Sequence, residues 1–577
     1  MNEMIKKLLS CVREYKLPSI LSPLTVSMEV LIEVLIPYLM ADLIDYGINK
    51  GDMAYILKMG LFLFLSALVS LMFGVLSGRF AAKASAGFAK NLRHDMFHAV
   101  QDFSFANIDK FSTASIITRL TTDVTQVQNA YQMIIRIAVR SPLMFAMSLI
   151  MALRVNAKVS MVFLIAVPIL IGALGFIMIK VHKIFERMFK TYDELNNTVQ
   201  ENLHGIRVVK AFVREDYEQK KFKGVSKLIY KLSTDAERIL AFNSPIMQFC
   251  VYGCMLLISW IGANLIQQSL MTTGELMSLF QYTMQILNSL MMFSMFFVMI
   301  VMSQASIKRI VEVLDEKSDL VNPKNPIMQV NDGSIEFSNV SFSYKKDSDT
   351  YSLKDIDLKI ESGQTIGIIG GTGSSKSTLV QLIPRLYDVS KGTLKVGGID
   401  VRDYDIETLR SEVAMVLQKN VLFSGTINDN IRWGNENATD EQIKRVCELA
   451  CADEFIEKFP DKYETYIEQG GTNVSGGQKQ RLCIARALLK KPKILILDDS
   501  TSAVDTATDA KIRKAFREEI PDTTKLIIAQ RISSVQESDK IIVLDEGKVV
   551  AFGSHDELMK TSNIYKEVYN TQMKGSE

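Results

Sequence analysis

The chain has 577 residues, more than one ordinary hydrophobic core accommodates, so we expect two or three domains. Hydrophobic residues make up 48% of it and charged residues 23%, with a mean hydropathy of +0.14, which indicates an apolar part joined to a soluble part. The formal net charge of +2 argues against a dedicated nucleic-acid-binding protein, because such proteins normally carry a clear basic excess.

The N-terminal half is predicted to be a membrane domain. Residues 1–16, MNEMIKKLLSCVREYK, are amphipathic and lack a small-residue cleavage site, so we predict a surface-lying elbow helix rather than a secretory signal. Six later stretches are long and apolar enough to cross a bilayer, which takes about 20 residues. They are residues 17–48, 54–79, 130–153, 155–180, 243–268 and 275–303. We therefore predict a six-helix transmembrane domain over residues 17–303.

The connections between these spans alternate in length. Residues 49–53, 154 and 269–274 are tight turns, whereas residues 80–129 and 181–242 are long, charged and rich in helix-forming residues. Both long connections carry many lysines and arginines, and basic residues near the ends of spans favour the cytoplasm. We therefore expect long intracellular helices, with both chain termini in the cytoplasm.

Two pairs of charged residues inside the predicted spans are spaced four positions apart. Glu29 and Glu33 share one face of the first helix, and Arg136 and Arg140 share one face of the third, because residues four apart are neighbours on a helix. Intramembrane charges usually face a bundle interior or a watery cavity, which favours a role in a substrate path. The alternative is that these residues pair with one another or lie at the inner membrane interface. The Met-rich residues 284–302 likewise fit either an adaptable cavity or packing in lipid.

The sequence changes character after residue 330. Short β-branched runs alternate with polar helical stretches, which is typical of an α/β domain with a largely parallel sheet. We therefore expect a linker over residues 304–330, which holds Pro323 and Pro326, and an α/β domain over residues 331–577.

The first chemical motif is GGTGSSKST, residues 370–378, between the strand TIGIIG and a helix. A phosphate cradle needs small residues that expose backbone N–H groups, a lysine for the phosphate charge and a hydroxyl for magnesium. Gly370, Gly373, Lys376 and Ser377 supply these groups. Ser375, however, stands where the pattern GxxxxGK[ST] has glycine.

The second motif is NVSGGQKQR, residues 473–481, which precedes the helix LCIARALLKK. Ser475, Gly476 and Gly477 form a small-residue helix start whose exposed amides also suit phosphate. The strand ILILDD, residues 494–499, follows and ends in two carboxylates. Two phosphate-binding helix starts and a strand-end carboxylate together indicate a nucleotide-driven machine.

With these motifs the chain resembles the ATP-binding cassette (ABC) exporters of the half-transporter type, and the resemblance covers essentially all of it. GGTGSSKST is similar to the family's Walker A loop, NVSGGQKQR to its signature motif, ILILD to Walker B, and residues 502–505, SAVD, to the D-loop. The resemblance implies an all-α six-helix transmembrane domain with long intracellular helices, fused to an α/β P-loop nucleotide-binding domain. It further implies a multi-pass protein of a bacterial cell membrane.

The resemblance also implies ATP and Mg²⁺ as cofactors. The nucleotide-binding residues that it implies are Tyr344, Gly370, Thr372, Gly373, Ser374, Ser375, Lys376, Ser377, Thr378, Gln418, Ser475, Gly476, Gly477, Gln478, Asp498 and Asp505. Among them Tyr344 is similar to the residue that stacks on adenine, and the metal is expected on Ser377, Gln418 and Asp498. Residues 108–124 and 205–216 resemble the segments that hold the family's two coupling helices, and Glu468 resembles a loop acid that contacts them.

Two catalytic positions depart from the family pattern. A glutamate that polarises water normally follows the Walker B aspartate, and a histidine on a later strand braces the γ-phosphate. Here Asp499 and Gln530 stand at these positions, so one carboxylate is a methylene short and the histidine is missing. Loss of general-base help typically slows a reaction roughly 100- to 10,000-fold. We therefore expect ATP binding with weak hydrolysis at this site.

The family's cassettes pair head to tail, so this chain's signature motif would complete a partner's site. A second half-transporter with the normal glutamate and histidine is the simplest partner, which predicts a heterodimer that exports amphipathic small molecules. A lipid or peptide exporter, a slow homodimer and a non-transporting regulatory protein are alternatives. The six predicted spans argue against a soluble ATPase of the DNA-repair type, and no nucleic-acid partner is expected. The fusion of both domains in one chain argues against an importer.

Overall fold

The computed structural model describes residues 2–345, 350–500 and 502–574. The chain divides into two compact units, which we call the helical unit (residues 1–101 and 112–316) and the α/β unit (residues 102–111 and 317–577). The short segment 102–111 thus belongs to the α/β unit, although it lies in the N-terminal half of the sequence.

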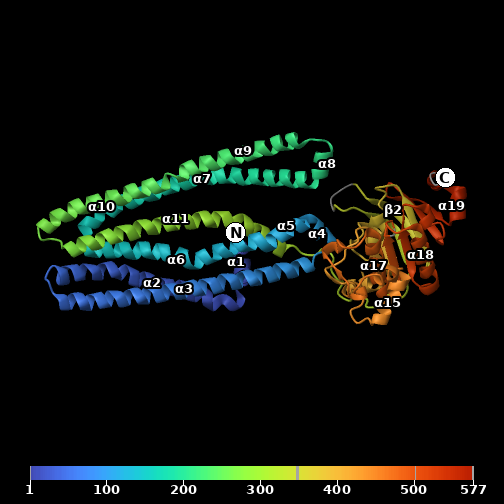
Figure 1. Ribbon diagram of the computed structural model, residues 1–577, viewed down its shortest axis with the longest axis horizontal. Helices are drawn as coiled ribbons and strands as arrows, with labels where there is room; N and C mark the ends of the chain where they lie inside the picture. Colours follow the sequence, from blue (N-terminus) through green and yellow to red (C-terminus); the bar gives the residue numbers. More distant parts are fainter. Residues whose placement is uncertain (1, 346–349, 501, 575–577) are drawn as a thin grey trace. The chain divides into compact units, whose positions relative to one another are not determined.

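The helical unit is built from long helices that run beside one another (Figure 1). Its elements are α1 (Asn2–Ser10), the 3₁₀ turn η1 (Arg13–Tyr15), α2 (Lys16–Asp42), the π segment η2 (Leu43–Ile48), α3 (Met53–Gln101), α5 (Thr113–Thr118), the π segment η3 (Arg119–Asp123), α6 (Val124–Val155), α7 (Ala157–His204), α8 (Ile206–Ala211), α9 (Glu215–Leu240), α10 (Asn243–Gln267) and α11 (Thr273–Asp315). The described residues contain six helices long and apolar enough to cross a membrane, which confirms the predicted number of spans.

The tight turns between spans are fixed by capping side chains. Asn156 has an extended backbone between α6 and α7, and its side chain accepts a hydrogen bond from the Val159 N–H. At the next tight turn, Thr272 and Glu275 form a reciprocal capping box that starts α11. The sequence limits of the domains stay predictions; in the structure α11 continues to Asp315 and the α/β unit resumes at Lys317.

The described residues of the α/β unit form three sheets. Its strands are β1 (Ile335–Phe342), β2 (Leu353–Ile360), β3 (Thr365–Gly370), β4 (Lys391–Val396), β5 (Ile399–Asp400), β6 (Val413–Val416), β7 (Gly425–Thr426), β8 (Tyr466–Ile467), β9 (Ile494–Asp498), β10 (Thr524–Ile528), β11 (Lys540–Asp545) and β12 (Lys548–Gly553). The six-stranded sheet has the order β12-β11-β3-β10-β9-β6, and only β12 pairs antiparallel in it. A four-stranded antiparallel sheet has the order β2-β1-β4-β5, and β7 pairs with β8.

The helices of the α/β unit surround these sheets. They are α4 (Phe105–Phe111), α12 (Lys376–Gln381), α13 (Ile406–Glu412), α14 (Ile427–Arg432), α15 (Asp440–Leu449), α16 (Asp453–Ile456), α17 (Gly476–Leu489), α18 (Thr506–Glu519), α19 (His555–Thr561) and α20 (Asn563–Lys574), with 3₁₀ turns η4 (Lys462–Glu464), η5 (Gln469–Gly471) and η6 (Ile532–Ser534).

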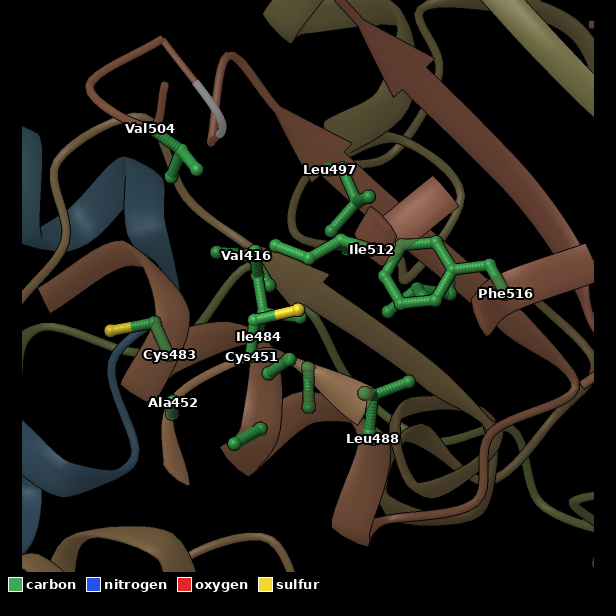
Figure 2. Packing of buried hydrophobic residues seen from close by; sticks show 14 of the residues in the cluster. Val416, Cys451, Ala452, Cys483, Ile484, Leu488, Leu497, Val504, Ile512 and Phe516 are labelled. Carbon is green, nitrogen blue, oxygen red and sulfur yellow. The ribbon is translucent and has the colours of Figure 1, made fainter. Parts of the chain in front are cut away.

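A buried apolar cluster holds α17 against the parallel sheet (Figure 2). Ile484 and Leu488 of α17 lie among Val416 of β6 and Leu497 of β9, and Phe516 of α18 belongs to the same cluster. β9 is buried along its whole length, as expected for a central parallel strand. This packing fixes the start of α17 and the carboxyl end of β9 in one rigid body.

Candidate functional site: a phosphate loop and a strand-end carboxylate pair

The loop between β3 and α12 has the geometry of a phosphate cradle. Lys376 lies at the first position of α12, and its Nζ donates hydrogen bonds to the carbonyl oxygens of Gly370 (2.9 Å) and Gly371 (2.8 Å). A Cβ at Gly370 would lie 2.2 Å from the Leu544 carbonyl oxygen, so this position requires glycine. At Gly371 and Gly373 an added Cβ would meet nothing within 4 Å, so their backbone faces open space.

Ser375 adopts a left-handed conformation in this loop, with φ 70° and ψ 27°. A residue with a Cβ pays roughly 1 kcal/mol or more in this region, which is why glycine is usual there. The Ser375 side chain makes no capping hydrogen bond to α12. The departure from the GxxxxGK[ST] pattern therefore places strain beside Lys376.

Two oxygen groups suited to a magnesium ion, from Ser377 and Asp498, are in contact at the carboxyl end of β9. Ser377 Oγ donates a 3.0 Å hydrogen bond to Oδ1 of Asp498, the last residue of β9. Burial raises the pKa of Asp498 above its usual value, the hydrogen bond from Ser377 opposes the rise, and the charge of Asp499 adds to it. Gln418 follows β6, which pairs in parallel with β9. A hydroxyl, a carboxylate and an amide oxygen are hard ligands that fit Mg²⁺.

The two residues at the departing catalytic positions are in direct contact. β9 and β10 pair in parallel with Ile528 opposite Asp498, so the residues that follow them meet at one edge of the sheet. There Gln530 Nε2 donates a 2.7 Å hydrogen bond to Asp499 Oδ2. Asp499 itself has a left-handed backbone, with φ 49°. The structure therefore brings together the pair that the sequence singled out.

Burial of the phosphate-loop lysine shifts its titration. Desolvation lowers the pKa of Lys376, whereas the nearby charges of Asp498 and Asp499 raise it. The ammonium group of Lys376 therefore lies within the influence of two carboxylates. A bound phosphate group would compete with these carboxylates for the lysine.

Tyr344 lies just after β1 and contacts the phosphate-loop helix. Its hydroxyl is 3.0 Å from Thr378 Oγ1, while the side chain is half exposed. The Tyr344 ring lies 5.3 Å from the ring of Tyr387 at an interplanar angle of 88°. An exposed aromatic ring beside a phosphate loop can stack on a base.

Tyr387 joins this aromatic group to α4. Its hydroxyl donates a 2.9 Å hydrogen bond to Asp109 Oδ2, and its ring lies 6.1 Å from that of Phe105. Burial and the Asp109 carboxylate raise the pKa of Tyr387. Sequence reasoning missed Tyr387, because no local motif marks it; only the proximity of α4, part of the first predicted intracellular segment, reveals it.

The start of α17 is a capped helix N-terminus. Ser475 N donates to Gln478 Oε1 (2.8 Å) and Gln478 N donates to Ser475 Oγ, so both residues form a capping box as their motif predicts. A Cβ at Gly477 would lie 2.7 Å from the Ala503 carbonyl oxygen. Gly476 has only Ala503 Cβ nearby, at 3.5 Å from an added Cβ.

The same helix is hydrogen-bonded to residues 502–505. Gln480 Oε1 accepts from Ala503 N at 3.0 Å, and Gln480 Nε2 donates to Ser502 Oγ at 3.3 Å. Asp505 caps the following helix α18 by accepting from Thr508 N, which holds the pKa of Asp505 below its usual value. Sequence reasoning did not single out Gln480 as a functional candidate. Its position inside the motif NVSGGQKQR could have indicated it.

Comparisons with known proteins agree on the family. Models of the ABC transporter transmembrane region and of the ABC transporter match residues 20–290 and 353–502. YfiB, an uncharacterized ABC transporter ATP-binding protein of Bacillus subtilis, is 37% identical over 99% of this chain and 100% of its own length. The chain belongs to the ABC transporter family. Rv1273c, an uncharacterized ABC transporter ATP-binding protein of Mycobacterium tuberculosis, is 34% identical over 93% of each chain.

This ABC transporter also shares its fold with a solved structure. The structure of a bacterial Atm1-family ABC exporter with ATP bound has a TM-score of 0.82 to this chain at 23% identity, over 97% of this chain and 98% of that chain. The predicted fold class, a six-helix transmembrane domain joined to an α/β nucleotide-binding domain, is therefore confirmed. The protein is a multi-pass membrane protein with an ATP-binding domain.

The helical unit of this ABC transporter contains a large cavity between α6, α7 and α11. Its volume is about 970 Å³. Apolar side chains dominate its lining, among them Phe145, Leu174, Met178, Phe293 and Phe297, while His182 and Glu186 add polar groups. The cavity has the size and chemistry of a site for amphipathic small molecules.

Of the two pairs of charged residues that the sequence singled out within the spans, three residues pair with one another. Arg140 forms ion pairs with Glu29 and, at 2.6 Å, with Glu33. The pairing that the sequence left open is therefore present for Glu29, Glu33 and Arg140, whereas Arg136 takes no part in it.

Proposed function

We propose that this chain is one subunit of an ATP-driven ABC exporter that moves amphipathic small molecules out of the cell, and that its own Walker side binds ATP but hydrolyses it weakly. The observation that carries the weak-hydrolysis part is the hydrogen bond between Gln530 and Asp499. The Atm1-family structure of similar fold is an exporter with ATP bound, which supports the direction of transport.

Nucleotide binding is assigned to residues whose geometry fits it. The glycine-rich loop and Lys376 bind the phosphates, while Ser377, Asp498 and Gln418 are the ligands for Mg²⁺. Tyr344 stacks on the base, and Thr372, Ser374 and Thr378 complete the loop. When bound, Mg²⁺ neutralises phosphate charge. None of these binding groups is Asp499 itself, so ATP binding survives even where hydrolysis fails.

Weak hydrolysis follows from the chemistry of the contact pair. Attack by water requires a base that accepts a proton, and Asp499 is the carboxylate nearest that role. Its Oδ2 already accepts a hydrogen bond from Gln530, and an amide neither takes up nor releases protons near neutral pH. Asp499 is also one methylene shorter than glutamate, and a displacement of about 1 Å in a catalytic carboxylate can slow the reaction about 100-fold.

The start of α17, which carries the signature motif, gives the chain a second proposed role, in the nucleotide site of a partner. Ser475, Gly476, Gly477 and Gln478 form a well-ordered helix N-terminus that suits a phosphate bound by another cassette. We therefore propose a heterodimer with a second half-transporter that carries the normal catalytic glutamate and histidine. The proposed location is the cell membrane, with both termini and the α/β unit in the cytoplasm, because the long connections are basic.

The substrate class is proposed from the cavity between α6, α7 and α11. Its apolar lining with few polar groups favours amphipathic drug-like or lipid-like molecules. The experiment that tests the proposal is purification of the tagged chain from its native membrane. Co-purification of a second half-transporter, with one nucleotide turned over and one retained per dimer, supports the proposal. A homodimer that turns over two nucleotides per cycle contradicts it.

A further inference from the structure

A second cavity of the helical unit lies beside the charged residues of the spans. Its volume is about 410 Å³. Glu29, Arg136 and Arg140 provide the charges of its lining, and Met133, Ile137 and Met292 are among its apolar side chains. Charged and apolar side chains therefore line one open cavity, which suits a molecule with a charged and an apolar part.

The charges of the cluster balance only when Arg136 is counted. Arg140 Nη1 pairs with Glu29 Oε1, and Arg140 Nη2 lies 2.6 Å from Glu33 Oε2, so one guanidinium serves two carboxylates. Arg136 supplies the second positive charge, and the formal charges of Glu29, Glu33, Arg136 and Arg140 sum to zero. Because an uncompensated charge is costly at membrane depth, a ligand with a net charge would upset this balance.

Two polar groups of the cavity lack protein partners. Glu29 Oε2 is buried and accepts no hydrogen bond from any residue that the structure describes. Among those same residues, 2–345, 350–500 and 502–574, Arg136 has no ion pair and no hydrogen bond. A guanidinium that lines a cavity without a protein partner, beside a carboxylate in the same lining, points to a ligand that carries both an anionic and a cationic group.

Two glycines of α3 make room for these groups. A Cβ at Gly74 would lie 3.1 Å from Glu29 Oε1, and a Cβ at Gly78 would lie 3.8 Å from Arg136 Nη1. The glycines are one helical turn apart, which is about 6 Å along the axis. The open carboxylate oxygen and the open guanidinium thus lie against successive turns of one helix.

We propose that this cavity binds the head group of a zwitterionic amphiphile. Arg136 holds its anionic group, the negative charge of the Glu29 side chain attracts its ammonium group, and its apolar part lies against Met133, Ile137 and Met292. This inference rests on the proposed export of amphiphiles, and it narrows that class to molecules that carry both charges and no net charge.

The test is equilibrium binding of labelled lysophosphatidylethanolamine to the purified full-length transporter in neutral maltoside micelles, without nucleotide. Arg136→Gln should weaken binding about tenfold, since a hydrogen bond to a charged group is lost. Arg136→Lys should retain most of the affinity. Arg154→Gln, at an exposed arginine in the last turn of the same helix, is the matched control and should leave binding unchanged.

Changes in the ligand test the second contact without changing the protein. The N-acetylated form, which keeps only the anion, and a long-chain amine, which keeps only the cation, should each bind about tenfold more weakly. Arg136→Gln should affect the first and spare the second. A short apolar peptide with free termini is the second source of the same chemistry, and competition between it and the lysolipid shows which source binds better.

Several results would overturn the inference. They are equal binding of the zwitterion and its N-acetylated form, unchanged binding in Arg136→Gln, or no zwitterion binding by a transporter that still exports other amphiphiles. The last result leaves the proposed function intact. Conversely, zwitterion binding lost in Arg136→Gln, in a protein that exports no amphiphile, supports the site and contradicts the proposed function.

Discussion

Gln530 Nε2 donates a 2.7 Å hydrogen bond to Asp499 Oδ2, across the carboxyl ends of two parallel strands. The contact follows from the register of β9 and β10, which places Ile528 opposite Asp498. Two unusual residues at separate points of the sequence are therefore one structural pair. Their effects on catalysis should be coupled, because contacting residues rarely act additively.

The first prediction concerns the chain without its proposed partner. The purified chain should bind Mg-ATP, because Lys376, Ser377 and Asp498 are in place, yet it should hydrolyse ATP very slowly. Asp499→Ala should change the residual rate by less than about threefold, since Asp499 contributes little base catalysis. Nucleotide binding and phosphate release measured on the same sample check this. Rapid turnover that survives Asp499→Ala would refute the assignment.

The second prediction compares the two sides of the chain in the assembled pair. Gly477→Asp should lower ATPase activity strongly, because a Cβ there would lie 2.7 Å from the Ala503 carbonyl oxygen and the carboxylate would repel phosphate. Ser475→Ala should do so more mildly, as it removes a helix cap that contributes about 1 kcal/mol. Asp499→Asn should have the smallest effect. Equal losses in all three variants would contradict a signature that serves the partner's nucleotide.

The sequence alone predicted the features that depend on residues close together along the chain. The six spans follow from apolar length, and the phosphate loop follows from a strand, small residues and a lysine in succession. It could not predict the Tyr387–Asp109 hydrogen bond, because these residues are 278 positions apart and no motif marks Tyr387. For the same reason it left open whether the intramembrane charges pair; only helix packing decides that Arg140 does and Arg136 does not.

The third prediction tests the contact between α4 and the nucleotide region. Tyr387→Phe removes the hydroxyl that donates to Asp109 Oδ2 but keeps the ring beside Tyr344. A partly exposed hydrogen bond to a carboxylate contributes about 1 kcal/mol, so substrate stimulation of the ATPase should fall roughly three- to fivefold at unchanged ATP affinity. Tyr466→Phe, at an exposed tyrosine, is the control. Unaltered stimulation in Tyr387→Phe would exclude a coupling role.

The fourth prediction concerns strain in the phosphate loop. Ser375→Gly should raise the thermal midpoint of the nucleotide-free full chain, because glycine adopts φ 70° without the cost of roughly 1 kcal/mol that a Cβ imposes. Ser375→Ala keeps the Cβ and loses no capping bond, so it should leave the midpoint near that of the parent. A midpoint that falls in Ser375→Gly, or rises equally in both variants, would show that the left-handed conformation is not strained.

The last prediction asks whether the pair can be repaired. Asp499→Glu restores carboxylate reach and Gln530→His restores a group that can brace a phosphate, so the double variant should hydrolyse ATP faster than either single variant. We expect only a partial gain, because position 499 has φ 49°, a region that aspartate tolerates better than glutamate does. The Gln530 carbonyl accepts from Gln572 Nε2 at 2.8 Å, and this backbone contact is retained in Gln530→His. Turnover should be measured in the assembled pair after the partner's catalytic glutamate is changed to glutamine, which silences the other site. If the partner's signature motif is intact and the double variant still shows no gain, the hydrogen-bonded Asp499–Gln530 pair is not what limits hydrolysis here.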